Sequence, residues 1–413
     1  MTRRISRRQF LRCSVRTAAT GVALPAIVRS GALATSNAPS ASDRIRLAYI
    51  GVGIRGDSLL GRYIKNPRFP VVAICDVDAH RRAKATDRVG PPCAQHNDYR
   101  RVLDQKDVDA VVISVPDHWH APIAVHACEA GMDVYCETPL SLTIGQGKKM
   151  VEASRRHGRV FQTGSQQRSA NEFRQACELV RSGRLGRVKR VLVDVWGTSR
   201  PCSLPAEPTP PGLDWNLWLG PAPRRPFHPK LHPTGWREFR DYSGGVMTDQ
   251  GAHHLDIIQW ALNLDASGPV EALPPTTDRQ WVTLKYPRGI RVLCGNTGIG
   301  GIRFEGNEGR ITVKRGLLQT EPEELGREPL RGDEVRLERS PDHQADWEEA
   351  MWKRARPIAD VEIGHRSATV CHLANIVTWL NRSIRWDPVS ETIIGDPEAG
   401  RWLDRPLRTP FAI

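Results

Sequence analysis

The feature that most constrains this chain is a glycine-rich turn at residues 51–56, with the pattern G-x-G-x-x-G. An apolar run, residues 45–50, precedes it, and a helix-compatible segment follows at residues 57–64. The first glycine of this pattern permits a tight strand-to-helix turn, the second lets the backbone approach a pyrophosphate, and the third lets helix and strand pack closely. The pattern therefore predicts a dinucleotide site. Its predicted members are Gly51, Gly53, Ile54, Arg55 and Gly56.

An acidic residue stands where such a site needs one. The apolar run 71–75 ends at Asp76, about 20 positions after Gly56. A carboxylate there can bind both ribose hydroxyls of NAD and would repel the 2′-phosphate of NADP. We therefore predict NAD as the cofactor, and the neighbouring Arg81 and Arg82 keep NADP open. The alternative is that Asp76 merely caps a turn.

Residues 44–164 alternate between short apolar runs and helix-compatible stretches. Further strands are predicted at residues 108–115, 133–137 and 159–163, with helices at 122–131 and 145–157. Strands that alternate with helices are typical of a parallel, doubly wound sheet. The predicted fold of this first domain is therefore a Rossmann α/β fold.

After residue 164 the pattern changes, and residues 165–413 predict a second, α+β domain. Strands are predicted near residues 188–196, 280–286, 290–296 and 309–314, and helices near 171–182, 245–262, 345–354 and 365–380. Residues 199–243 hold ten prolines and little periodicity. A loop this long inside a compact domain is functional or disordered. Two interpretations stay open: a lid that carries His228 and His232, or a rigid arm at a dimer contact.

Residues 1–34 have the features of an export signal. Residues 6–12 (SRRQFLR) form a twin-arginine pattern, and a moderately apolar stretch leads to a possible cleavage site at residues 32–34. The apolar stretch is too short to span a bilayer, so no stable membrane span is expected. We predict export by the twin-arginine route to the periplasm, with residues 35–43 as a linker. The alternative is a basic disordered tail.

The net charge and the cysteine pattern bear on two kinds of partner, nucleic acids and metal ions. The formal net charge is +13, but seven arginines and no acidic residue lie in residues 1–34, so the rest of the chain carries +6. No long basic run occurs later, and a nucleic-acid partner is therefore not predicted. The nine cysteines form no C-x-x-C pair, and no spacing typical of metal ligands is present, so no metal is predicted.

Two polar motifs follow predicted strands. Residues 114–120 (SVPDHWH) come at the end of one strand, and residues 136–140 (CETPL) at the end of the next. Because ligands of open α/β sheets bind at the carboxyl ends of the strands, both turns should lie beside the cofactor.

A third motif, residues 244–256, carries acid–base groups. Asp249, His253 and Asp256 are spaced so that one helical face would hold all three. An imidazole with carboxylates in reach is a general acid/base unit. The alternative is a structural histidine–aspartate pair that caps the glycine-rich start of the helix.

With these motifs the chain resembles the Gfo/Idh/MocA oxidoreductases, over nearly all of residues 44–410 and closest to their exported, twin-arginine branch. The motifs that carry the resemblance are residues 51–56, 116–120, 136–140, 164–168, 213–221 and 243–260. The resemblance implies a Rossmann domain, then a domain with an open, mostly antiparallel sheet that often makes a dimer or tetramer contact. It implies NAD(P)-dependent chemistry at a hydroxyl of a sugar or cyclitol.

The resemblance also implies residue roles. Asp249 would orient the substrate, and His253 would take the hydroxyl proton as hydride leaves for the nicotinamide. Glu137 would lie near the nicotinamide ribose. The remaining cofactor contacts are predicted at Pro116, His118 and His120, and the remaining substrate contacts at Trp119, Gln166, Arg168 and His254.

At one catalytic position the chain departs from the family pattern Glu-Lys-Pro, because Thr138 replaces the lysine. An ammonium would favour a developing alkoxide and lower the pKa of a neighbouring imidazole, whereas a hydroxyl brings no charge. Three hypotheses follow: a dehydrogenase in which His253 compensates, together with His254 or Lys148; an enzyme that cleaves glycosides by NAD-assisted oxidation and elimination; or a non-catalytic, nucleotide-holding sugar binder. Export favours a tightly bound cofactor in all three, because free NAD is scarce outside the cytoplasm.

Overall fold

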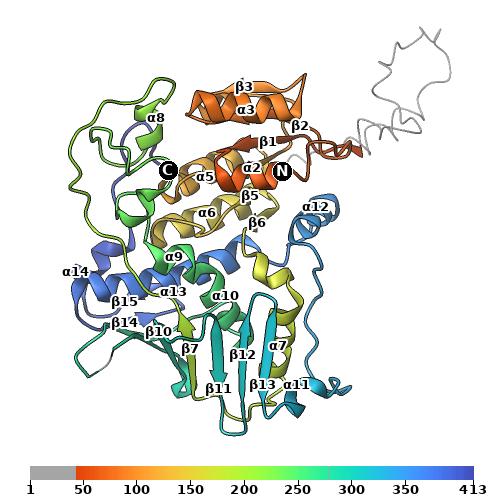
Figure 1. Ribbon diagram of the computed structural model, residues 1–413, viewed down its shortest axis with the longest axis vertical. Helices are drawn as coiled ribbons and strands as arrows, with labels where there is room; N and C mark the ends of the chain where they lie inside the picture. Colours follow the sequence, from red (N-terminus) through yellow and green to blue (C-terminus); the bar gives the residue numbers. More distant parts are fainter. Residues whose placement is uncertain (1–42, 279) are drawn as a thin grey trace, which may run out of the picture. The chain divides into compact units, whose positions relative to one another are not determined.

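The computed structural model describes residues 43–278 and 280–413, so the predicted export signal and most of the predicted linker lie outside the described residues. Residues 45–413 form one compact unit with two sheets. Figure 1 shows helices α9 (Val246–Asp249), α10 (Gly251–Ala261) and α13 (Val361–Leu380) between the sheets. Across the described ranges, no helix combines the length and the apolar character needed to cross a membrane.

The first sheet has six parallel strands in the order β3-β2-β1-β4-β5-β6. Every residue of β1, β4 and β5 is buried, which explains why these strands stand out as continuous apolar runs. The order is that of the Rossmann fold and confirms the predicted fold class. The strands are β1 (Leu47–Ile50), β2 (Val71–Cys75), β3 (Ala94–His96), β4 (Ala110–Ile113), β5 (Asp133–Cys136) and β6 (Phe161–Thr163).

Helices cover this sheet, and some of them were not predicted. The helix after the glycine turn begins at Ile54, earlier than expected, because Gly56 fits inside its first turn. Helix α3 was missed because it is strongly charged and buries only Ala85 and Thr86. The helices are α2 (Ile54–Leu60), α3 (Ala79–Val89), α4 (Tyr99–Leu103), α5 (His120–Glu129) and α6 (Ile144–His157).

The second sheet has nine strands in the order β13-β12-β11-β7-β10-β9-β8-β14-β15. All neighbours are antiparallel except β7 and β10, which confirms the expected open, mostly antiparallel sheet. Its apolar core includes residues of α7 (Asn171–Arg181), α10 and α13. The strands are β7 (Arg190–Asp194), β8 (Glu271–Leu273), β9 (Val282–Lys285), β10 (Arg291–Gly295), β11 (Ile302–Glu305), β12 (Arg310–Lys314), β13 (Leu317–Glu321), β14 (Ile384–Asp387) and β15 (Thr392–Ile393).

Residues 199–243, here called the proline-rich segment, leave β7 and fold around an apolar cluster of their own. The cluster buries Trp218, Phe239 and Tyr242. Regular structure within the segment is confined to α8 (Trp215–Leu219) and the 3-10 turn Gly235–Glu238. The segment is therefore held mainly by its own apolar side chains, with isolated main-chain bridges in place of a sheet.

Residues near the end of the chain return to the first sheet. Helix α12 (His343–Lys353) places Trp347 in the same apolar cluster as Tyr49. Phe411 packs edge-on against Trp119, with ring centroids 5.0 Å apart. The last 70 or so residues thus complete the core of the first domain, across the boundary predicted after residue 164.

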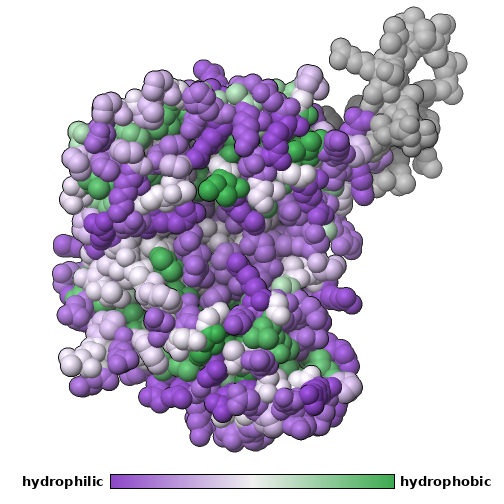
Figure 2. Space-filling model, viewed as in Figure 1, coloured by the Kyte–Doolittle hydropathy of each residue, from purple (hydrophilic) through white to green (hydrophobic). Residues whose placement is uncertain are grey.

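On the face shown in Figure 2, hydrophilic residues predominate and apolar residues form small, separate patches. Scattered apolar side chains of this kind are ordinary on a protein surface. Ile54 is among the most exposed, at 79%. Because Ile54 belongs to the glycine turn, we interpret its exposed side chain as a candidate ligand contact.

Candidate active site

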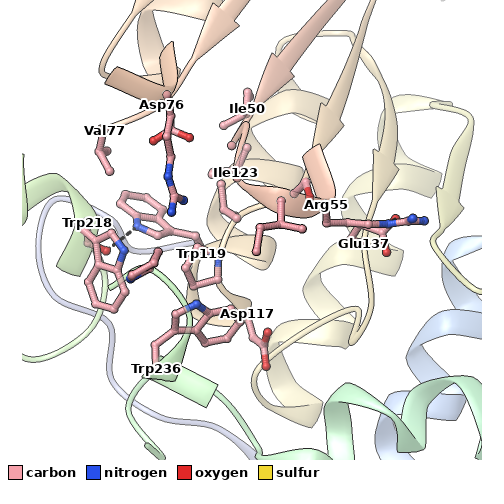
Figure 3. A pocket seen from close by; sticks show the side chains of 18 of the residues that line it. Ile50, Arg55, Asp76, Val77, Asp117, Trp119, Ile123, Glu137, Trp218 and Trp236 are labelled. Atoms are coloured by element: carbon pink, nitrogen blue, oxygen red, sulfur yellow. Dashed lines mark hydrogen bonds and ion pairs between the residues drawn. The ribbon is translucent and has the colours of Figure 1, made fainter. Parts of the chain in front are cut away.

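A cavity of about 440 Å³ lies where residues of the two domains meet. Its walls come from the glycine turn, the carboxyl ends of β2, β4 and β5, the proline-rich segment, and α9 and α10. Figure 3 shows Trp119, Trp218 and Trp236 on one side of it and the paired Arg55 and Glu137 on the other. The size and the position at strand ends are typical of a small-molecule site.

The glycine turn has no room for side chains at two positions. Gly51 has a φ of +85°, and a Cβ there would lie 2.6 Å from the carbonyl oxygen of Ser114. A Cβ on Gly56 would overlap the carbonyl oxygen of Gly51. The turn is thus pressed against the sheet while its outer side lines the cavity, as a dinucleotide requires. The turn residues that line the cavity are Gly51, Gly53, Ile54 and Arg55, and Gly56 packs behind them.

Asp76 lines the cavity and also braces the glycine turn. Its two carboxylate oxygens accept the backbone N–H groups of Val52 and Asp78, each at 2.9 Å. Burial raises the pKa of Asp76, and these two donors oppose that effect. Each oxygen keeps a further lone pair, so a ribose hydroxyl can still bind. Both interpretations of Asp76, a turn brace and a ribose ligand, are therefore compatible with the geometry.

Arg81 and Arg82, the two arginines that left NADP as an alternative cofactor, lie in different positions relative to the cavity. Arg81 lines the cavity, 3.7 Å from the carboxylate of Asp78. Arg82 does not line it and donates to the carbonyl oxygen of Asp76 at 2.6 Å. Only Arg81 of this pair can therefore reach a cofactor.

His118 and His120 do not line the cavity, which corrects their prediction as cofactor contacts. The Nε2 atom of His118 lies 3.0 Å from the carbonyl oxygen of Trp218. The ring of His120 lies between the carbonyl oxygens of Val115, at 2.9 Å, and Pro139, at 2.7 Å. Burial lowers the pKa of both rings, that of His118 to about 3. His118 is therefore neutral at neutral pH, and both rings contact main-chain carbonyl oxygens and so hold the turns in place. The residues of motif 114–120 that do line the cavity are Ser114, Val115, Pro116, Asp117 and Trp119.

Arg168 and Asp256 form a buried ion pair away from the cavity. The guanidinium of Arg168 donates to Asp256 and to Asp265, each at 2.7 Å, and Ser367 also donates to Asp256 at 2.7 Å. A buried guanidinium needs such carboxylates. Two predictions are thereby corrected: Arg168 is not placed to bind substrate, and Asp256 does not join the acid–base face. His254 does not line the cavity either.

The acid–base group consists of His253, Thr138 and Asp249. The Nε2 atom of His253 lies 3.1 Å from Oγ1 of Thr138, so the residue that replaces the family's lysine contacts the predicted base directly. Asp249 accepts a hydrogen bond from Arg237 at 2.9 Å. All four side chains line the cavity.

Glu137 forms a second charged pair in the cavity. It accepts from Arg55 at 2.8 Å and from Gln166 at 3.0 Å. Gln166 also donates to the hydroxyl of Tyr135 at 2.9 Å. The predicted cofactor contact Glu137 and the predicted substrate contact Gln166 thus lie together.

Burial lowers the pKa of His253 to about 3, and the positive charge of Arg315 adds to the effect. The ring is therefore neutral at neutral pH. Its Nδ1 atom has no hydrogen-bond partner among the described residues. A neutral imidazole beside a hydroxyl can accept a proton from it.

Asp117 is a buried acid in the same cavity. It is 2% exposed, and burial raises its pKa to about 8, helped by the charge of Asp249. One of its oxygens has no hydrogen-bond partner in the described part of the chain. Asp117 is therefore mostly protonated at neutral pH and can donate a hydrogen bond or a proton.

Several cavity residues were not singled out from the sequence. Arg237 and Trp236 come from the proline-rich segment, and Arg315 comes from the turn after β12, where no motif marks it. Asp117 lies inside a recognised motif, and its burial was the missing information. Conversely, Lys148 lies outside the cavity, 3.7 Å from Glu391, and does not replace the missing lysine.

Two family models match the chain. The model described as "Oxidoreductase family, NAD-binding Rossmann fold" matches residues 45–165, and the model described as "Oxidoreductase family, C-terminal alpha/beta domain" matches residues 194–413. Together they cover the whole first sheet, most of the second sheet, and every cavity-lining residue except Gln166.

Curated relatives match over part of their length. An inositol 2-dehydrogenase of Salmonella typhimurium is 31% identical over 144 residues, which are 34% of this chain and 43% of that protein. A glycosyl hydrolase family 109 protein of Stenotrophomonas maltophilia is 33% identical over 150 residues, 34% of this chain and 31% of that protein. The chain thus spans less than half the length of these relatives.

Solved structures share the fold over a wider range. The WlbA dehydrogenase of Bordetella pertussis, in complex with NADH and UDP-GlcNAcA, has a TM-score of 0.60 at 19% identity and covers 83% of this chain and 99% of its own. A levoglucosan dehydrogenase in complex with NADH has a TM-score of 0.59 at 18% identity, with the same coverage. The family models, with the glycine turn and sheet order above, show that this chain belongs to the Gfo/Idh/MocA family of NAD-binding oxidoreductases.

Proposed function

We propose that the protein oxidises or reduces a sugar, a sugar derivative or a cyclitol by hydride transfer at a hydroxyl-bearing carbon, with NAD rather than NADP. The observation that carries the proposal is the contact between His253 and Thr138 inside the cavity that the glycine turn lines. The partial similarity to inositol 2-dehydrogenases supports the substrate class. The carboxylate of Asp76 supports NAD.

NAD, when bound, supplies the hydride acceptor for alcohol oxidation, and the side chains handle the proton. His253 is neutral and accepts the substrate's hydroxyl proton at Nε2. The hydroxyl of Thr138, 3.1 Å away, holds the ring in place or passes the proton to it. Asp249, fixed by Arg237, orients the substrate. Because position 138 brings no charge, hydrogen bonds stabilise the developing alkoxide here.

The cofactor, in this proposal, stays bound through turnover. The proline-rich segment joins the end of β2 by two main-chain hydrogen bonds between residues 77–79 and 212–214, at 2.9 and 3.0 Å. His232 adds a contact to Asp78 at 3.3 Å. Because the segment also lines the cavity, it would cover part of the exit path of a dinucleotide. This geometry favours the lid interpretation of the segment.

A retained cofactor also suits export in the folded state. We propose that residues 1–34 direct twin-arginine export and that the protein works in the periplasm, where it could not recruit free NAD. The family resemblance supports a homo-oligomer formed through the second sheet.

A second candidate function is NAD-assisted glycoside cleavage. In that cycle NAD would supply transient oxidation of a ring hydroxyl, which would acidify a neighbouring C–H bond. A base would take the C–H proton while the C–O bond to the glycosidic oxygen breaks and that oxygen is protonated; water would then add to the double bond, and reduction of the carbonyl would leave no net redox change. Asp117 favours this candidate because a protonated carboxyl can give its proton to the leaving oxygen. The partial similarity to glycosyl hydrolase family 109 proteins also supports it.

One set of measurements separates the candidates. Purified protein is denatured, the released nucleotide is identified, and native protein is then mixed anaerobically with sugars, cyclitols and aryl glycosides. Absorbance of reduced nicotinamide supports the dehydrogenase. Aryl-glycoside cleavage without reduced nicotinamide supports the second candidate. Sugar binding without any reaction would support the third hypothesis, a non-catalytic sugar binder that holds a nucleotide. If the protein binds no nucleotide at all, all three hypotheses are overturned.

Position 138 is tested with a matched series. Thr138→Val removes the hydrogen bond to His253, worth about 0.5–1.5 kcal/mol, so the rate of nucleotide reduction should fall roughly two- to tenfold. Thr138→Ser keeps the hydroxyl and should stay near the wild-type rate. Thr138→Lys should raise the rate, and an unchanged rate would show that another group already supplies the stabilisation.

A further inference from the structure

Three arginine side chains reach the cavity at its acid–base group, and two of them are paired. Arg55 binds Glu137 at 2.8 Å, and Arg237 binds Asp249 at 2.9 Å. The charges of these four side chains cancel. The two remaining titratable groups there, His253 and Asp117, are mostly neutral at neutral pH.

Arg315 is the third arginine, and no carboxylate pairs with it in the described part of the chain. It lies in the turn between β12 and β13 and lines the cavity. Its charge lowers the pKa of both His253 and His254, which places the guanidinium on the histidine side of the cavity. Arg315 is an exposed residue that borders the cavity, so one positive charge without a carboxylate partner among the described residues lies near His253.

We propose that the substrate is an anionic sugar, whose carboxylate or phosphate oxygens pair with Arg315 while a neighbouring hydroxyl lies at Thr138 and His253. The inference rests on the proposed function, because it names the substrate class of the same site. A guanidinium offers a planar fork of N–H donors that matches two anionic oxygens. A neutral sugar would leave that fork without its best partner.

Substrate charge would also act on the base. A negative group on Arg315 offsets the field that lowers the pKa of His253. The imidazole then accepts a proton more readily in the complex with an acidic sugar than in a complex with a neutral one. Compared with a neutral sugar, an acidic sugar should therefore both bind more tightly and reduce the nucleotide faster.

The test compares D-glucose, D-glucuronate and glucose 6-phosphate on the protein with its cofactor. Binding is followed by the fluorescence of the cavity tryptophans Trp218 and Trp236, and turnover by reduced nicotinamide. The variants are Arg315→Met, Arg315→Lys and, as a control, Lys314→Met. Lys314 is exposed and does not line the cavity, so the control removes an equal charge one residue away.

Wild type should bind one of the two anionic sugars roughly 10- to 100-fold more tightly than glucose, as for hydrogen bonds to charged groups. Arg315→Met should abolish that ratio, Arg315→Lys should keep only part of it because an ammonium has the charge without the planar fork, and Lys314→Met should keep most of it. The identity of the preferred anion separates carboxylate from phosphate. Equal binding of all three sugars, or a ratio that survives in Arg315→Met, would overturn the inference.

The two readouts keep this result separate from the proposed function. An anionic preference in fluorescence without nucleotide reduction by any sugar would support the role of Arg315 and count against hydride transfer. Reduction by glucose as fast as by either anionic sugar would support hydride transfer and overturn the inference.

Discussion

The cofactor end and the acid–base end of one cavity are built differently. At the cofactor end, the shape comes from the main chain: Gly51 and Gly56 leave no room for a Cβ, and Asp76 holds the turn through two backbone N–H groups. At the acid–base end, every functional atom belongs to a side chain, and Thr138 and His253 come from different domains. A main-chain site tolerates little change anywhere, whereas a side-chain site can change its chemistry one residue at a time.

The sharpest test of this contrast is His253→Asn. Loss of the general base should lower the rate of nucleotide reduction by roughly 10²–10⁴, while nucleotide content stays that of wild type, because the ring is not part of the cofactor cradle. The matched control is His254→Asn, which changes the adjacent residue outside the cavity and should remain close to wild type. Loss of nucleotide in His253→Asn would show that the two ends are not separable.

The complementary change is Gly56→Ala at the cofactor end. One added methyl meets the carbonyl oxygen of Gly51, which cannot move without shifting β1. Overpacking of this kind costs about 1–3 kcal/mol, so nucleotide affinity should fall roughly five- to 150-fold. Gly268→Ala is the control, because a Cβ there meets nothing within 4 Å. Equilibrium titration with NAD measures the affinity of both variants. If Gly56→Ala binds NAD as tightly as wild type, the cofactor end does not depend on its main-chain shape.

This contrast also explains what could be predicted from the sequence. Main-chain sites have local signals: the glycine spacing, the apolar strands and Asp76 lie within about 30 residues of one another. The strands β1 and β2 and a dinucleotide ligand were predicted from these signals, and β4, β5 and β6 were predicted from apolar runs further along the chain. Strand β3 was not predicted, because three residues with one of them exposed carry too little pattern.

The acid–base end was predicted from family motifs, and its errors have one cause. A motif names residue types without saying which way they face. His120 and Arg168 stand in such motifs yet satisfy buried polar groups, and Arg315 stands in none yet faces the cavity. Orientation depends on contacts between segments far apart in the chain, such as Arg168 with Asp256, and these appear only in the fold.

At the acid–base end, the buried Asp117 should also make the stability of the folded protein depend on pH. Its pKa of about 8 in the folded protein means that the fold keeps a proton that the unfolded chain releases near pH 4. Folding is therefore progressively disfavoured as pH rises from about 4 to 8. Asp117→Asn removes this effect, so the variant should melt higher than wild type at pH 8, by roughly 2 °C or more, with a smaller difference at pH 5. An equal difference at both pH values would contradict the assignment.

The smallest expected effect belongs to the proline-rich segment. His232→Ala removes one contact of 3.3 Å to Asp78 but leaves the main-chain hydrogen bonds between residues 77–79 and 212–214. The contact to the Asp78 carboxylate is long for a hydrogen bond, so we take about 0.5–1.5 kcal/mol for it, and bound nucleotide should dissociate roughly two- to tenfold faster. The readout is loss of nucleotide during dilution into buffer that contains an NAD-consuming enzyme.

His228→Ala is the matched control, because His228 lies in the same segment, does not line the cavity, and accepts from the backbone of Lys230. It should release nucleotide at the wild-type rate. Equal release from both variants and wild type would mean that side chains of the segment do not hold the cofactor. A much larger loss in His232→Ala would mean the opposite: the cofactor end would then depend on a side-chain latch, and the difference between the two ends would be one of degree.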